Sequence, residues 1–335
     1  MATIYDVSLL AGVSLATVSR VVNNNAKVSE NTRKKVHQAM QQLGYRPNNI
    51  AQSLASNRSN SIGVLMSQLD GPFYGPMMRQ IETVLRSANK HAIFAAGHSD
   101  ASLEQDAIDF LLNRGCDALI IDADALDDET LVALSQQKTP LVVINRLVPA
   151  LKAQCVHLDN VQGGYLATRH VLEHGHRQLA FITGPREKLD ARDRLMGYKI
   201  ALAEFDVHFN EELCQESDYH EEGGYLAMLE LLKADKSFTC VVCANDQMAS
   251  GAIAACLEQG LQVPADISFI GFDNIPFPRY ISPKLTTISN PIEAMGLAAA
   301  TWILKQTYAD VPPCAPPMFK PELIERESIK SLPSR

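Results

Sequence analysis

Short apolar runs alternate with helix-like segments over most of this chain, and this alternation limits the possible fold more than any other feature. The apolar runs lie at 62–66, 92–96, 118–121, 141–144, 179–182, 240–244 and 267–272. Segments with helical spacing lie at 103–113, 162–173, 194–204, 223–233 and 247–258. Continuous apolar strands that alternate with helices are typical of parallel sheets covered on both faces. Because roughly 270 residues exceed one comfortable doubly wound unit, the sequence predicts two α/β subdomains that divide near 158–160.

The first 45 residues have a different pattern, with short helices and no strand. Ile4, Val7 and Ala11 form one apolar stripe on a first helix. A turn, a second helix and a third helix over 30–43 follow. The turn contains Gly12, and Ser14 and Ser29 are the N-caps of the second and third helices. Val18, Val21 and Val22 form the buried side of the second helix, and Gly44 ends the third. Two short helices joined by a turn that contains glycine predict a helix-turn-helix.

The charge of the chain divides between these two regions. The whole chain has 30 basic and 38 acidic side chains, a net charge of −8, which taken alone argues against a nucleic-acid binder. Residues 1–60 carry seven basic and two acidic side chains, so this segment is +5, and the rest of the chain is −13. A basic head on an acidic body reverses the first conclusion, because the head can attract phosphates while the body repels DNA.

The second helix of a helix-turn-helix enters the major groove, and its N-terminal residues meet base edges. With the valines assigned inward, the outward positions are Leu15, Ala16, Ser19 and Arg20. Arg20 could pair with a guanine, and Leu15 and Ala16 could contact a thymine methyl. Thr17 and the helix-start amides could hold phosphates. We also expect DNA contacts at Thr3, Ser14 and Asn23. The alternative is a small three-helix domain with a solvated basic face.

Several classes of protein are excluded or disfavoured by what the sequence lacks. No apolar run approaches the roughly 18 residues of a membrane span, and no signal-peptide pattern opens the chain. The seven cysteines are an odd, scattered number, so we expect reduced thiols in a cytoplasmic protein. Cys240 and Cys243 lie inside an apolar run without a second ligand pair, so no metal is expected. No phosphate-loop, dinucleotide or nucleophile motif suggests a cofactor or an enzyme.

Longer motifs carry a family resemblance over essentially the whole chain. They include TIYDVSLLAGVSLATVSRVVN at 3–23, YRPN at 45–48, AQSLAS at 51–56, CANDQMASGA at 243–252 and VPADISFIGFDN at 263–274. With these motifs the chain resembles the lactose-repressor family of bacterial transcription regulators, and within it galactose repressors first and aryl-β-glucoside repressors next. The resemblance implies a head at 1–47, a hinge helix and linker at 48–60, and a periplasmic-binding-protein-like body at 61–335. Its subdomains would comprise 61–159 with 291–320, and 160–290 with 321–335.

The resemblance also gives residues 48–56 a role. In such repressors this segment folds into a hinge helix only on operator DNA and enters the minor groove. Leu54 would then insert between base pairs, and Asn48 and Ala51 would lie against the backbone or groove. A short segment that begins with Asn-Asn should be a marginal helix alone, which suits folding on binding. The alternative is a plain linker.

Polar side chains follow several predicted strands, where open α/β sheets bind ligands. Gly71–Tyr74 follow the first apolar run as a loop, and Arg194 lies near a helix start. Carboxylates, amides and arginines beside aromatic rings suit a sugar. The family resemblance implies effector contacts at Arg194, Asn245 and Asp273, pocket positions at Phe73, Tyr74 and Asn145, and a stacking ring at Tyr219. Asp246 and Asn274 could instead cap the elements that follow their strands.

These features predict a repressor of a sugar-utilisation operon that a small sugar, galactose or a β-glucoside or β-galactoside, releases from its operator. A homodimer would match a pseudo-palindromic operator, and no leucine heptads suggest a tetramer. The same family permits a corepressor-type regulator, whose ligand strengthens DNA binding. An exported sugar-binding protein and an α/β enzyme are the alternatives from other classes. The missing signal peptide and catalytic motifs oppose them.

Overall fold

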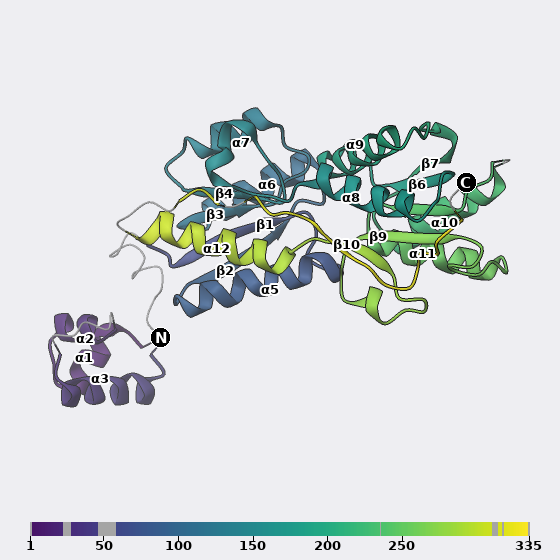
Figure 1. Ribbon diagram of the computed structural model, residues 1–335. Helices are drawn as coiled ribbons and strands as arrows, with labels where there is room; N and C mark the ends of the chain where they lie inside the picture. Colours follow the sequence, from purple (N-terminus) through teal and green to yellow (C-terminus); the bar gives the residue numbers. More distant parts are fainter. Residues whose placement is uncertain are drawn as a thin grey trace. The chain divides into compact units, whose positions relative to one another are not determined.

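The computed structural model describes residues 2–22, 28–45, 58–234, 236–309, 314–316 and 318–333. The chain forms two compact units, residues 1–61 and 62–335, and each is described by itself (Figure 1). Among the described residues, no single helix is long and apolar enough to cross a membrane. Helices α1 and α2 reach that length only together, across a bend of 106°.

The first unit is a three-helix head, as the sequence predicts. It comprises α1 (Ile4–Ala11), α2 (Leu15–Val22) and α3 (Glu30–Leu43). Gly12 has φ +65° between the first two helices, and Gly44 has φ +59° after the third. The Oγ atoms of Ser14 and Ser29 accept the backbone N–H groups of the third residues of α2 and α3, so both predicted caps are confirmed. Among the described residues of the head, the buried side chains of the core are Val7, Ala11, Val18, Val21, Val36 and Ala39.

The body begins with a five-stranded sheet in the order β2-β1-β3-β4-β5 (Figure 1). Its strands are β1 (Ser61–Met66), β2 (His91–Ala96), β3 (Ala118–Ile121), β4 (Leu141–Ile144) and β5 (Cys155–Val156), with β1/β3, β3/β4 and β4/β5 paired in parallel. The helices are α5 (Gly71–Ser87), α6 (Ala101–Asn113), α7 (Asp128–Ser135) and α12 (Ile292–Tyr308). On β3, Ile120 belongs to the apolar cluster of α5 and α12, whereas Leu119 and Ile121 belong to that of α6 and α7. Both faces are therefore covered, as predicted.

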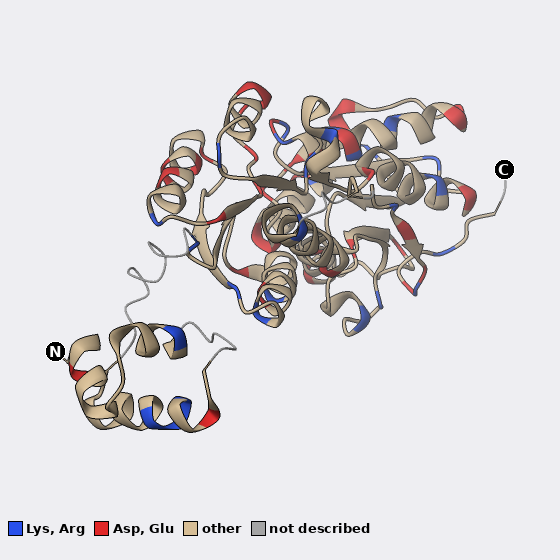
Figure 2. Ribbon diagram, turned by 90° about the vertical axis from the view of Figure 1, so that its left-hand side faces the viewer, with Lys and Arg blue, Asp and Glu red and all other residues tan. Residues whose placement is uncertain are grey.

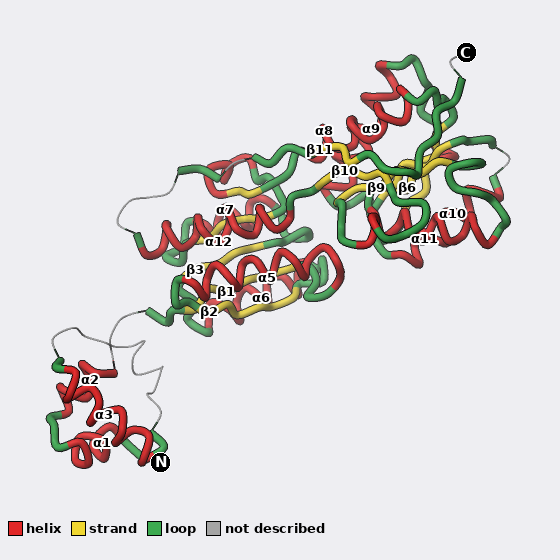
Figure 3. Tube along the Cα trace, turned by 60° about the horizontal axis from the view of Figure 1, so that its bottom comes forward, coloured by secondary structure: helices red, strands yellow, loops and turns green. Residues whose placement is uncertain are grey.

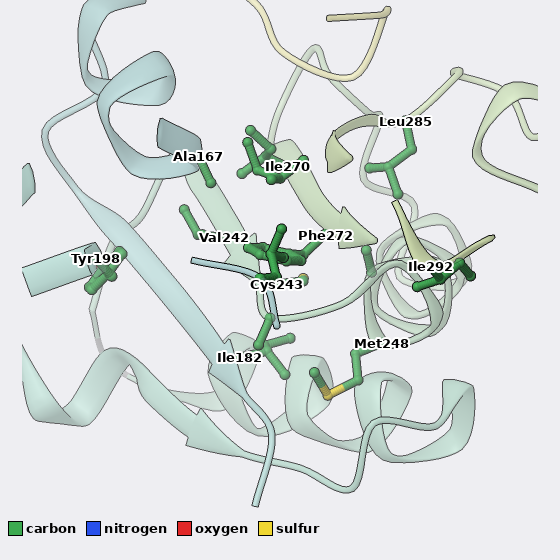
Figure 4. Close-up of a cluster of buried hydrophobic side chains, with 14 of the residues drawn as sticks. Ala167, Ile182, Tyr198, Val242, Cys243, Met248, Ile270, Phe272, Leu285 and Ile292 are labelled. Atoms are coloured by element: carbon green, nitrogen blue, oxygen red, sulfur yellow. The ribbon is translucent and has the colours of Figure 1, made fainter. Parts of the chain in front are cut away.

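A second sheet has six strands in the order β11-β10-β9-β8-β6-β7. Figure 3 labels β11, β10, β9 and β6 among them. The six strands are β6 (Leu179–Thr183), β7 (Cys214–Glu216), β8 (Cys240–Cys243), β9 (Ser268–Asp273), β10 (Thr286–Ser289) and β11 (Glu322–Ile324). All neighbours pair in parallel except β10 and β11, which are antiparallel. The flanking helices are α8 (Asn160–Glu173), α9 (Leu189–Glu204), α10 (Glu221–Lys233) and α11 (Asp246–Glu258). Figure 4 shows part of the core of this sheet, where Ile182 of β6 lies beside Met248 of α11, and Val242 of β8 lies beside Phe272 of β9.

One prediction about this body is wrong. Residues 71–74 are not a loop but the first turn of α5. Gly71 and Pro72 look like turn residues in sequence, yet proline suits the first helical turn because its missing N–H would have no intrahelical partner there. The aromatic side chains Phe73 and Tyr74 are thus mounted on a helix rather than on a free loop.

Candidate functional site

The outward face of α2 has the side chains that the sequence predicts for it. Ala16 and Arg20 are exposed, and Leu15, Thr17 and Ser19 are half-buried, whereas Val18 and Val21 are buried in the head. Figure 2 shows basic residues on α2 and α3, where Arg20 and residues 33–35 lie. A helix that exposes small and basic side chains from its first turn onward can enter a major groove.

The six other residues predicted to bind DNA either cap a helix or lie outside the described part of the chain. Thr3 caps α1 by accepting the N–H of Asp6, whose carboxylate accepts the N–H of Thr3 in return. Ser14 caps α2, and its Oγ lies 2.9 Å from Oγ1 of Thr17. These caps fix the start of each helix, where backbone N–H groups attract phosphates. Asn23, Asn48, Ala51 and Leu54 lie outside the described residues.

A cavity of about 360 Å³ lies where strands of both sheets end. Such a volume falls in the range of small-molecule sites, about 300–1,000 Å³. Asn145 follows β4, Asn245 lies two residues beyond β8, and Asp273 ends β9. The structure brings all seven residues predicted for the effector to this cavity: Phe73, Tyr74, Asn145, Arg194, Tyr219, Asn245 and Asp273.

Arg194 is the centre of the cavity's polar network. Its side chain is almost fully buried in the second turn of α9, where Nε donates to Oδ1 of Asn160 at 2.9 Å and Nη1 donates to the carbonyl of Ala244 at 2.5 Å. Nη2 lies 3.4 Å from Oδ1 of Asp273, and the guanidinium lies over the ring of Phe272, 3.8 Å from its centroid. These contacts hold the guanidinium in one orientation, with a hydrogen-bonding edge at the cavity.

Asp273 faces Arg194 in a strained backbone conformation. Its φ is +97°, and Asn145 and Tyr219 also have positive φ, at 66° and 70°. Such conformations cost free energy in non-glycine residues and cluster at functional sites. Burial raises the pKa of the Asp273 carboxyl, and the attraction of Arg194 opposes that rise. Asn290 supplies one further donor, with Nδ2 at 3.2 Å from Oδ1.

Tyr219 forms the aromatic wall of the cavity on the side of the second sheet. Its hydroxyl donates to Oδ2 of Asp190 at 2.9 Å. Burial, and then the charge of Asp190, raise the pKa of the Tyr219 hydroxyl, so it remains a donor at neutral pH. Gly184 makes room for the ring, because a Cβ at that position would collide with it. Phe73 and Tyr74 of α5 lie edge to face, with ring centroids 5.0 Å apart.

An ion pair joins the two sides of the cavity. Lys188, before α9, donates from Nζ to Oδ2 of Asp124 at 2.8 Å and to Oγ of Ser99 at 2.9 Å. Burial alone would raise the pKa of Asp124, but the charge and hydrogen bond of Lys188 leave that pKa below its usual value. Burial acts to lower the pKa of Lys188, and the attraction of Asp124 raises it overall. Both groups are therefore charged at neutral pH, and they connect the second-sheet side to the loop after β3.

Two polar residues beside the cavity, Asp246 and Asn274, stabilise the fold and do not line the cavity. Asp246 accepts from Oγ1 of Thr287 at 2.6 Å and from the N–H of Ile275 at 3.0 Å. Burial raises the pKa of Asp246 well above its usual value. Asn274 accepts from Arg326 at 2.6 Å. Both residues thus have structural contacts, but Asp246 does not cap α11 as the alternative expected. The cap is Asn245, which accepts the N–H of Met248 and donates to the Tyr219 carbonyl.

The prediction from sequence omitted several residues that line the cavity. Asp124 and Lys188 form the ion pair across it, Asp190 pairs with Tyr219 and Arg194 on one side, and Gln68, Asp70, Asp218, His220, Glu221 and Gln247 complete the polar lining. Asp124 follows β3, so the strand-end rule would have found it. Within the described residues, one group of metal-ligand side chains is close enough to share an ion, and it lies outside this cavity.

A helix-turn-helix head and a two-sheet body with a ligand-sized cavity define a class: ligand-responsive transcription regulators. The model described as "Bacterial regulatory proteins, lacI family" matches residues 3–48, and "Periplasmic binding protein-like domain" matches residues 168–329. The chain is 39% identical to the HTH-type transcriptional regulator GalR of Escherichia coli K12 over 331 residues, which covers 99% of this chain and 96% of that protein. The chain belongs to the lacI family of bacterial regulatory proteins.

Other relatives and solved structures agree with this assignment. The HTH-type transcriptional repressor PurR of Proteus mirabilis is 35% identical and covers 99% of this chain and 98% of its own. A lac repressor dimer bound to operator and the anti-inducer ONPF superposes with a TM-score of 0.87 at 30% identity, over 98% of this chain and 99% of that one. As the sequence predicts, the protein is a DNA-binding transcription regulator rather than an enzyme.

Proposed function

We propose that this protein represses a sugar-utilisation operon and that a small neutral sugar, bound in the cavity, releases it from its operator. The observation that carries this proposal is the pairing of Arg194 with Asp273 at the strand ends, beside aromatic rings. Such planar groups bind vicinal hydroxyls in pairs, and a ring accepts the apolar face of a sugar. Solved relatives include a regulator in complex with cellobiose, at 28% identity and a TM-score of 0.73 over 98% of this chain and 100% of that one.

The charge of the lining favours a neutral ligand over a phosphorylated one. Six carboxylates face two cationic side chains around the cavity: Asp70, Asp124, Asp190, Asp218, Glu221 and Asp273 against Lys188 and Arg194. An anionic ligand would meet net repulsion there. Galactose and β-glucosides or β-galactosides are therefore the first candidates, in line with the relationship to GalR.

In this proposal the head reads the operator through the face of α2. Arg20 contacts a guanine, Leu15 and Ala16 contact thymine methyls, and Ser19 faces the groove. Thr3, Ser14, Thr17 and Asn23 hold phosphates or lie beside them, and Asn48, Ala51 and Leu54 act from a hinge helix in the minor groove. The head spans 1–47, the hinge and linker 48–60 and the body 61–335. Two heads are needed because one small module has too few contacts for tight binding, and a lac repressor has been solved as an operator-bound dimer.

Release follows from a preference of the sugar for one arrangement of the two subdomains. The ion pair of Lys188 and Asp124 already joins the cavity's sides, so a sugar between them would favour the closed arrangement. Closure would then move the dimer interface and separate the hinge segments. A ligand shifts such an equilibrium only by its difference in affinity between the two states, typically about 1–3 kcal/mol of coupling.

Corepression is the second candidate, because purine repressors also cover nearly the whole chain at 34–35% identity. Calorimetry of the full-length protein against galactose, glucose, cellobiose, aryl-β-glucosides and hypoxanthine separates the ligand classes. We expect a sugar to bind and Asp273→Ala to abolish that binding while leaving operator affinity intact. Asp106→Ala, an exposed carboxylate on α6, is the matched control. Binding of hypoxanthine alone, or an unchanged sugar isotherm in Asp273→Ala, would contradict the proposal.

A further inference from the structure

A second group of potential ligands lies away from the cavity, at the carboxyl end of α8. His170 lies in the last turn of that helix, His174 is its C-cap, and Glu325 follows directly after β11. One ligand atom from each side chain lies within 4.8 Å of the others. We propose that these three side chains bind a divalent transition-metal ion of the zinc class, and that the ion fastens the C-terminal segment to α8.

The hydrogen bonding of His174 leaves one ring nitrogen available for a metal. Its Nδ1 lies 2.8 Å from the backbone oxygen of His170. A carbonyl oxygen can only accept, so Nδ1 carries the proton and Nε2 carries the lone pair. A histidine ligand usually donates its second ring nitrogen to a carbonyl or a carboxylate in this way, because the bond fixes both tautomer and ring orientation.

His170 supplies the second observation. Its side chain belongs to the buried interior at 6% exposure, yet Nε2 has no hydrogen-bond partner among the described residues. A buried polar atom without a partner is uncommon and costs free energy. The two imidazole rings lie against each other, with centroids 4.4 Å apart. A metal ion bound to Nε2 would give this buried nitrogen a partner.

The donor set selects the class of metal. Two imidazole nitrogens and one carboxylate suit zinc and its neighbours, whereas magnesium and calcium prefer oxygen ligands alone. Bonds of about 2.0–2.1 Å in a tetrahedron separate the ligand atoms by roughly 3.3 Å. The present spacing must close by an ångström or more. Glu325 is exposed, so rotation of its side chain can provide that movement while buried His170 and the hydrogen-bonded ring of His174 stay in place.

The consequence would be structural. The segment after β11 already lies along the end of α8 and the turn that follows it, where the N–H of Leu332 donates to the carbonyl of His174 at 2.8 Å. Nε2 of His176 lies 3.0 Å from the carbonyl of Lys330 in the same way. A metal at Glu325 would add a third attachment at the start of this segment. Because the ion binds the folded state and not the unfolded one, it would raise thermal stability by mass action.

The test is zinc chloride titration of the full-length, tag-free protein in a Cys314→Ser background. That substitution removes the exposed thiol, and the other six cysteines are buried. We expect one zinc ion per chain, saturable binding by calorimetry, and a melting temperature that rises with zinc concentration. Cobalt(II) at the same site should give the intense visible absorption of tetrahedral coordination, which adventitious octahedral binding lacks.

The variants His174→Gln and Glu325→Gln decide the assignment, because both positions are accessible and should fold normally. Each should weaken zinc binding roughly tenfold or more and remove the zinc-dependent rise in melting temperature. His91→Gln, an exposed histidine at β2, is the matched control and should bind zinc like the parent. No saturable binding by the parent, or equal affinity in the two variants and the control, would overturn the proposal.

Discussion

Removal of the Arg194 side chain should strongly destabilise the body. The guanidinium is 3% exposed and holds Asp273 at 3.4 Å and Asn160 at 2.9 Å. Among the described residues, Arg194→Ala would leave the buried Asp273 carboxylate with one side-chain donor, Nδ2 of Asn290 at 3.2 Å. Loss of one partner from a buried ion pair costs about 3–5 kcal/mol, because the other charge remains without compensation. That loss is a large part of the roughly 5–15 kcal/mol that stabilises a typical domain.

Urea unfolding of the full-length protein measures this cost, and Arg192→Ala is the matched control. Arg192 is exposed on the same helix, two residues away, and does not line the cavity. The control should change the free energy of unfolding by less than about 0.5 kcal/mol. If Arg194→Ala unfolds at the same urea concentration as the control, the buried network does not stabilise the body as argued.

The pH dependence of the stability of Arg194→Ala is an independent test of the same argument. The pKa of Asp273 is already raised by burial, and without the opposing attraction of Arg194 it must rise further. A folded state with a raised carboxyl pKa binds its proton more tightly than the unfolded state, so stability is lost as pH rises through that pKa. The deficit of Arg194→Ala should therefore be smaller at pH 5 than at pH 8. An equal deficit at both pH values would refute the role given to Asp273.

Three further experiments test other parts of the account. Lys188→Met and Asp124→Asn should each weaken sugar binding. In a calorimetric double-mutant cycle, the two substitutions should show a coupling free energy of about 0.5–3 kcal/mol. Additive losses would mean that the ion pair does not act as a unit. Gly184→Ala should displace the ring of Tyr219 and weaken sugar binding at unchanged operator affinity, and a normal isotherm would contradict this packing. Arg20→Ala should cost about 1–3 kcal/mol of operator binding and relax specificity at one base pair, measured by binding to single-substitution operators; equal weakening on all sequences would indicate only a phosphate contact.

Local signals made the head predictable almost to the residue. The third helix was expected over 30–43 and is Glu30–Leu43, because the cap at Ser29 and the left-handed Gly44 both act within one turn of the helix ends. The turn at Gly12 follows from the same kind of local constraint. Buried strands such as β3 and β4 were equally clear, since every residue in them is apolar and covered on both faces.

Elements whose burial depends on distant partners were not predictable in this way. The strand β10 reads Thr-Thr-Ile-Ser, and β7 reads Cys-Gln-Glu, so neither has a distinctive apolar pattern. Their place in the sheet comes from pairing with β9 and β6, which lie outside the short segments that would have to predict them. The start of α5 was missed for the opposite reason, because its glycine and proline suggest a turn more strongly than the aromatic residues suggest a helix.

The cavity residues also divide into those that a local sequence rule predicts and those that only the folded chain brings together. Asn145, Asn245 and Asp273 follow from the rule that ligands bind beyond the carboxyl ends of parallel strands. Lys188 does not, because its partner Asp124 is 64 residues away and only the folded body brings the two charges together. Tyr219 came from the family resemblance alone. Its φ of +70° is a property of the folded backbone, and nothing in the residues around it predicts that conformation.

Operator affinity measured with and without ligand tests the central claim most directly. An operator selected by this protein from random DNA, labelled with a fluorophore, is titrated with the full-length chain alone and with each sugar of the panel at saturation. The account predicts that one sugar weakens binding about 5- to 150-fold, and that Asp273→Ala binds the operator normally but no longer responds. Tighter binding in the presence of that ligand, or an unchanged affinity with every sugar, would contradict release by a sugar in the cavity.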